Sequence, residues 1–270
     1  MAVSMQGDPV RIDLQILTHL RFSDEFSDSL EHIPTLLDGL NEEFIPATIV
    51  ADDEHREAWC TYQKKYEKAL VSLVESNDDI ELTDEERERL QSALMRKHAS
   101  EVFRDHLDTE LEVLNSPIIP NNGSLYTADH VISSEYGVNI VNNAHLLNPL
   151  EFVHSDGDAF VSSRSDCWQL ISDMCQVAEK FPIPPRHVVV SVSGHGLNNL
   201  RGSAFVANKY IHKETGDLVS APCQVVFLNH TDIVDWLNTA LSTPNDADPT
   251  ARPVFLSEIL DSSNVIVLES

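Results

Sequence analysis

A histidine between two glycines, in the motif Ser193-Gly194-His195-Gly196, has the residue types of a proton-transfer site. Imidazole titrates near neutral pH, so a positioned histidine can take up or release a proton during a reaction. The motif ends an apolar run whose residues 188–190 are all valine and which follows two prolines. Such a run, bounded by helix-breaking residues, predicts a strand buried on both faces. The sequence therefore predicts that His195 lies at the carboxyl end of a central strand, where open α/β sheets bind their ligands.

Strand and helix patterns alternate before this motif, which predicts a parallel sheet. Residues 137–141 form a short apolar strand, and a turn at residues 155–158 separates two short extended pieces. We expect Ser165 to cap a helix with one apolar stripe, formed by Cys167, Ile171, Met174, Ala178 and Phe181. This β–α–β order implies a right-handed crossover between parallel strands.

The chain after His195 offers a hairpin, a helix and a final apolar run. Residues 203–211 and 218–228 flank a turn, and we interpret them as a surface excursion near the histidine. Thr231 is the expected cap of a helix with Ile233 and Leu237 inward. Residues 265–268 are apolar, and we expect residues 264–268 to form a core strand beside the strand that leads to His195.

The first 115 residues predict a separate acidic, mostly helical region. A helix is expected at about residues 53–74, and residues 10–16 alternate as a strand would. Thr83 and Glu86 match a capping box, which would open a helix that could run to Leu114. Proline, asparagine and glycine then predict a linker, so the expected division is 1–115, a linker at 116–134 and an α/β domain at 135–270.

Composition narrows the function classes. The net charge of −26 argues against binding nucleic acid or an anionic membrane surface. No window predicts a membrane span or a signal peptide, and four cysteines without a CxxC pattern favour a reducing compartment, so we expect a cytoplasmic protein. No sequence pattern calls for a metal or another cofactor.

Residues 135–270 resemble the caspase and metacaspase-like cysteine peptidases. The run VVVSVSGHG at residues 188–196 is similar to that family's histidine motif, and residues 137–144 look like its first core strand. Residues 265–270, VIVLES, resemble the approach to its nucleophile motif, in which the cysteine would be the next residue. The resemblance implies a caspase-like, mostly parallel sheet flanked by helices.

The resemblance also implies roles for individual residues. His195 would be the general acid/base, and the backbone N–H of Gly196 would be an oxyanion-hole donor. Asn198 and Arg201 would contact a peptide or protein substrate. Because the chain holds no cysteine at the expected nucleophile position, the implied cysteine endopeptidase should be inactive as it stands.

Several alternatives stay open from the residues alone. The chain can be a caspase-fold pseudoenzyme or regulator that binds a protein partner, and Cys223 can be a substitute nucleophile. A hydrolase using Ser193 or Ser270 is a further option, although neither serine lies in a G-x-S-x-G sequence. The remaining options are a metal site at His154, Asp156 and Asp158, and a nucleic-acid mimic built on the acidic charge.

Overall fold

A computed structural model describes residues 3–7, 9, 84–108, 110–121, 124–146, 148–165, 167–181, 183–194, 197, 204–242, 256–263 and 267. Residues 10–16, whose alternation allows a strand or a helix, and the helix expected at 53–74 lie outside the described residues. The predicted helical character of region 1–115 is therefore tested only at residues 3–7 and 9 and from Asp84 onward.

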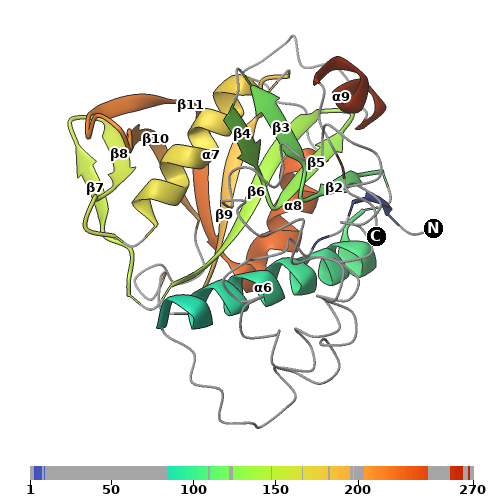
Figure 1. The fold of residues 1–270 in the computed structure, drawn as a ribbon, viewed down its shortest axis with the longest axis horizontal. Coiled ribbons are helices and arrows are strands. Elements are labelled where there is room, and N and C mark those ends of the chain that lie inside the picture. Colours follow the sequence, from blue (N-terminus) through green and yellow to red (C-terminus); the bar gives the residue numbers. More distant parts are fainter. Residues whose placement is uncertain are drawn as a thin grey trace, which may run out of the picture.

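A seven-stranded sheet forms the centre of the molecule (Figure 1). Its order is β1 (Ser4–Gln6), β2 (Glu112–Asn115), β5 (His130–Ser134), β6 (Gly137–Leu146), β9 (His187–Gly194), β11 (Leu218–Asn229) and β10 (Phe205–Ile211). β6, β9 and β11 are mutually parallel, while β5 and β10 run against the other strands. The predicted α/β class and the parallel pairing of the 137–141 and 187–193 strands are confirmed.

The crossover between β6 and β9 follows the predicted order. The hairpin of β7 (Phe152–Ser155) and β8 (Asp158–Val161) comes first, and helix α7 (Trp168–Lys180) follows. The expected stripe of α7 is buried at Ile171, Met174 and Ala178, which pack against the sheet. Cys167 rather than Ser165 is the N-cap residue of α7. The sequence periodicity thus predicted this unit except for its cap.

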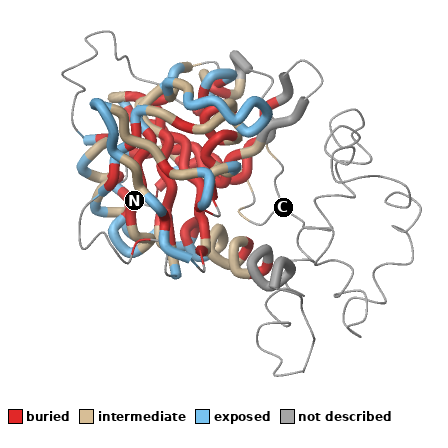
Figure 2. Tube along the Cα trace, turned by 90° about the vertical axis from the view of Figure 1, so that its left-hand side faces the viewer, coloured by how far each residue is buried: buried red, intermediate tan, exposed pale blue. Residues whose placement is uncertain are grey.

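Each face of the sheet has its own apolar cluster, and Figure 2 shows the buried positions concentrated in the central strands. Val188 and Val190 of β9 pack with α7 and α9 (Leu256–Ser263). Val189 points to the other face and packs with α6 (Asp84–His106) and α8 (Ile233–Leu241). Successive side chains of a strand alternate between faces, so one continuous apolar run serves both clusters.

Helix α6 is shorter than its sequence pattern predicts. It begins at Asp84, directly after the predicted cap, but it ends at His106 rather than Leu114. Asn238 of α8 donates to the carbonyl of His106 at 3.2 Å and accepts from the backbone N–H of Asp108 at 3.0 Å. These bonds give the backbone at the end of α6 a tertiary partner, and residues 112–115 form strand β2 instead.

The predicted linker at 116–134 is wrong. This segment contains the hairpin of β3 (Ile118–Asn121) and β4 (Ser124–Thr127), followed by the core strand β5. Ile119, Val131 and Ile132 are buried, so the apolar residues between the turn-forming residues belong to the core. Since β1, β2 and β5 precede residue 135, the sheet also crosses the predicted domain boundary.

The excursion predicted after His195 is also corrected. Its second half is β11, which pairs in parallel with β9 from Gln224 to Asn229 and is buried from residue 225 to 228. β9 therefore has β6 and β11 as its two neighbours, and these strands take the place beside β9 that was expected for a 264–268 strand. Of that segment only Val267 is described, and a Cβ placed on Gly7 after β1 would lie 2.7 Å from its Cγ1.

Candidate functional site

Polar side chains gather where β6, β9 and β11 end, on the face of the sheet that α6 crosses. The register pairs His145 with Ser193, Leu146 with Gly194, and Asn229 with Val192. These positions form the carboxyl edge of the parallel strands, the edge at which α/β sheets bind ligands. α6 contributes Met95, Arg96 and His98 to the same region.

Gly194 ends β9 in a conformation that requires glycine. Its φ is +77°, and a Cβ there would lie 2.5 Å from the carbonyl oxygen of Leu146 and 3.2 Å from Cε1 of His145. A side chain would therefore be strained and would collide with backbone. The predicted site residues His195, Gly196, Asn198 and Arg201 follow in sequence, and all four lie outside the described residues.

A serine and a histidine are in contact at this edge. Oγ of Ser193 lies 2.9 Å from Nδ1 of His145, and both side chains are half-buried. The Ser193 hydroxyl also lies 2.9 Å from the Met95 sulfur on α6. These contacts join β9, β6 and α6, and the Ser193 and His145 side chains remain partly exposed to solvent.

A second pair of the same type lies deeper. Oγ of Ser191 is 2.9 Å from Nδ1 of His230, and Ser191 is fully buried. The His230 ring packs against that of His98, with centroids 5.6 Å apart. Burial lowers the pKa of His230, and the neighbouring His98 lowers it further, so the imidazole stays neutral near pH 7.

A buried carboxylate completes the polar region. Asp129 accepts hydrogen bonds from the backbone N–H of Asn143 at 2.7 Å and from its side chain at 3.4 Å. The guanidinium of Arg96 lies 3.9 Å from the other carboxylate oxygen. The backbone N–H of Asp129 in turn donates to Oδ1 of Asn142 at 2.9 Å. This network ties the start of β5 to the carboxyl half of β6 and to α6.

The cysteines lie elsewhere. Cys223 precedes Gln224, whose partner is the first residue of β9, so about 26 Å of strand separates it from Gly194. Burial raises the pKa of the Cys223 thiol to about 12. Cys175 is buried on α7, and burial raises its pKa even further. Cys167 is also buried, while Cys60 lies outside the described residues.

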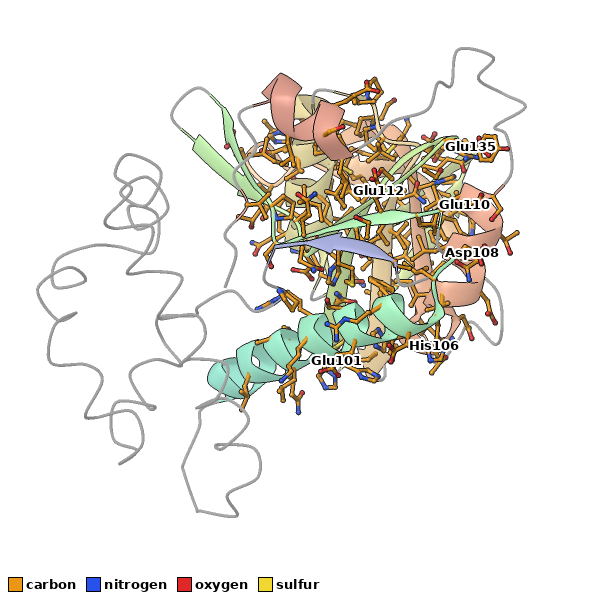
Figure 3. The ribbon with its side chains drawn as sticks, turned by 90° about the vertical axis from the view of Figure 1, so that its right-hand side faces the viewer. Glu101, His106, Asp108, Glu110, Glu112 and Glu135 are labelled. Atoms are coloured by element: carbon orange, nitrogen blue, oxygen red, sulfur yellow. The ribbon has the colours of Figure 1, made fainter. Side chains whose placement is uncertain are left out.

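Charged residues at the other end of the sheet do not contribute to this edge. Figure 3 shows Glu110, Glu112 and Glu135 near the β2–β5 side, and the register places Glu112 and Glu135 by the amino end of β6. The neighbouring Tyr136 has a raised pKa because of its hydrogen bond to Glu135, with smaller effects of burial, the charge of Glu135 and that of Glu110.

The proposed metal ligands of the β7–β8 hairpin have other partners. Asp158 pairs with Lys209 at 2.8 Å, and the His154 ring packs against Phe205 with centroids 5.1 Å apart. Asp156 sits in the turn with a φ of +53°. Across the part of the chain that the structure describes, no three His, Cys, Asp or Glu side chains gather as metal ligands.

Sequence reasoning missed His145 and His230. The strand before His145 was expected to end at residue 141, but β6 continues to Leu146. Val141, Asn143 and His145 are spaced two residues apart, and residues with this spacing share one face of a strand. This spacing could have predicted that the strand continues to His145. His230 follows an apolar run just as His195 does. This similarity was missed because residues 218–228 were interpreted as a surface excursion and not as a core strand.

No described helix has the length and apolar composition needed to cross a membrane. Comparisons of the chain with protein-family models, with curated proteins and with solved structures each find no match.

Proposed function

We propose that the chain carries the histidine half of a caspase-like domain and acts as a regulator that binds a peptide or protein partner and has no cysteine-peptidase activity. The observation that carries this proposal is the end of β9. Strand β9 lies between two parallel neighbours, and its last residue is a glycine in a left-handed conformation. His195 and Gly196 follow this glycine in sequence. In this proposal His195 occupies the general acid/base position of the family.

The distribution of thiols argues for a non-catalytic role. A cysteine peptidase needs a thiolate within reach of its histidine. Cys223 is at the amino end of the β9–β11 pair, roughly 26 Å of strand from Gly194, and its pKa of about 12 keeps it protonated. Cys167 and Cys175 are buried in the core under α7. None of these three thiols is suited to attack a peptide beside His195.

In this proposal strand β11, a parallel neighbour of β9, corresponds to the nucleophile strand that lies beside the histidine strand in the family. It ends at Asn229, which pairs in register with Val192 near the carboxyl end of β9. A thiol installed at residue 229 should therefore lie near His195 and become reactive if the caspase-like arrangement holds.

The test is a comparison of two engineered thiols in the full chain. Asn229→Cys should react with iodoacetamide at pH 6 at least about 10-fold faster than Glu214→Cys, an exposed control in the β10–β11 turn. Adding His195→Ala should remove that excess. Equal rates for the two thiols, or an excess that survives His195→Ala, would overturn the caspase-like proposal.

A peptidase assay tests the non-catalytic role separately. The unmodified chain should not cleave fluorogenic peptides with Arg, Lys or Asp before the scissile bond, with Ca²⁺ or with EDTA. A peptidyl chloromethyl ketone should not label Cys60, Cys167 or Cys175. Cleavage that is lost in both His195→Ala and Cys223→Ala would instead identify Cys223 as a nucleophile.

A further inference from the structure

We propose that Ser193 and His145 form a second reactive site, a serine–histidine dyad that accepts an acyl group from a small carboxylic ester. The inference uses the contact between β6 and β9 and does not depend on the caspase-like proposal or on His195. Ser193 is the nucleophile and His145 is its base, with Oγ and Nδ1 2.9 Å apart. A nucleophile and a base in hydrogen-bond contact are the minimum unit of this chemistry.

The hydroxyl proton of Ser193 has two acceptors available, and their strengths differ. A thioether sulfur such as that of Met95 is a weak acceptor, whereas the unprotonated nitrogen of a neutral imidazole is a strong one. The hydroxyl therefore donates to His145 whenever Nδ1 carries no proton. In that arrangement the proton already points along the path that it follows when Oγ becomes a nucleophile.

Access distinguishes this pair from its neighbour. Ser191 and His230 have the same 2.9 Å contact on the same face, but Ser191 is fully buried. Ser193 and His145 are half-buried at the end of the strands, where Gly194 adds no side chain. A Cβ on residue 194 would lie 3.2 Å from Cε1 of His145, so any side chain at this position would crowd the imidazole.

The reaction balances without a metal or redox partner. Ser193 Oγ forms a bond to the ester carbonyl carbon while its proton moves to Nδ1 of His145. The tetrahedral intermediate then breaks the bond to the alcohol oxygen, and the alcohol leaves with that proton. Water attacks the acyl-serine in the same way, giving a carboxylic acid and restoring the hydroxyl.

A small alkyl fluorophosphonate tests the dyad in the full chain, because Oγ attack on phosphorus expels fluoride and leaves a permanent adduct. Intact mass and peptide mapping should find one adduct per chain, on Ser193. His145→Gln keeps a polar side chain of similar reach but has no basic nitrogen, so labelling should slow at least about 100-fold. The release of p-nitrophenol from p-nitrophenyl acetate should fall in parallel.

Ser191→Ala is the matched control, since it removes a neighbouring serine that also touches a histidine. Its labelling rate should stay within about twofold of the unmodified chain, and circular dichroism should show that every variant is folded. Three results would overturn the proposal: no adduct on the folded chain, an adduct mainly on another residue, or an equal rate in His145→Gln. Ser193→Ala gives the background of both assays.

Discussion

The carboxylate of Asp129 and the backbone N–H of Asn143 are joined by a buried hydrogen bond of 2.7 Å, which ties the start of β5 to the carboxyl half of β6. The same carboxylate faces the Arg96 guanidinium of α6, and Asp129 is only 2% exposed. One side chain thus connects two strands and the helix that covers them, directly beside the candidate site.

Replacing this carboxylate should destabilise the fold. Asp129→Ala leaves a buried N–H without its acceptor and the Arg96 charge without its partner, so the free energy of unfolding should fall by about 3 kcal/mol. Urea denaturation followed by circular dichroism measures the change. Asp105→Ala, at an exposed position of α6, should change it by less than about 0.5 kcal/mol. Similar values for the two variants would show that the Asp129 network contributes little.

The thiols should be unreactive in the folded chain. With a pKa of about 12, roughly one Cys223 in ten thousand is a thiolate at pH 8. The unfolded thiol, with a pKa near 8.5, is about a quarter ionised at that pH. Iodoacetamide should therefore modify Cys223 at least about 100-fold more slowly in buffer than in urea, measured by peptide mass spectrometry. Fast modification in buffer would contradict the burial and register assigned to β11.

Stability should decrease in mild acid because of His187. Burial, with a smaller contribution from the charge of Arg186, lowers the pKa of His187 from 6.5 to about 4. Below pH 6.5 His187 therefore binds a proton in the unfolded chain but stays unprotonated in the folded chain until the pH approaches 4. His187 therefore does not lower the free energy of unfolding above pH 6.5. As the pH falls from 6.5 toward 4, the free energy of unfolding should fall by about 2 kcal/mol after solvent screening.

A variant pair isolates this contribution from that of other groups, including His230, whose lowered pKa acts in the same direction. His187→Gln should reduce the loss of unfolding free energy between pH 7 and pH 4.5. His212→Gln, a matched histidine substitution just after β10, should leave the loss unchanged. If both variants match the unmodified chain, His187 does not remain neutral in the folded protein.

Helix α6 should be part of the folding unit. Phe103 is fully buried in the cluster that α6 shares with β6, β9 and α8, and its ring meets His130 edge-on with centroids 5.1 Å apart. Phe103→Ala should lower the free energy of unfolding by about 3–5 kcal/mol, while the exposed Arg104→Ala should change it little. Equal effects would indicate that α6 is only loosely attached.

Removing residues 1–115 should prevent folding of the remainder for the same reason. The deletion removes α6, β1 and β2, and it uncovers Val141, Val189 and Ile132 on the face that α6 covers. The fragment 116–270 should be insoluble or should bind a hydrophobic dye strongly. A soluble fragment with a cooperative thermal transition would support the division of the chain that its composition predicts.

Local pattern in the sequence was sufficient for the elements whose environment is uniform. The valines at 188–190 predicted a strand buried on both faces, and the stripe of Ile171, Met174 and Ala178 predicted α7. The same patterns predicted the parallel pairing of β6 and β9, because a helix between two strands requires a crossover. Fold class and the position of Gly194 at a strand end therefore followed from residue types and spacing.

Pairing between distant segments was decided only by the tertiary structure. The 218–228 segment alternates like a surface hairpin in its first half, and its buried second half becomes a central strand only because β9 is beside it. Likewise, His145 reaches Ser193 because the register of two strands 48 positions apart brings them together. Register depends on which side chains fill a shared core, and no local period encodes that choice.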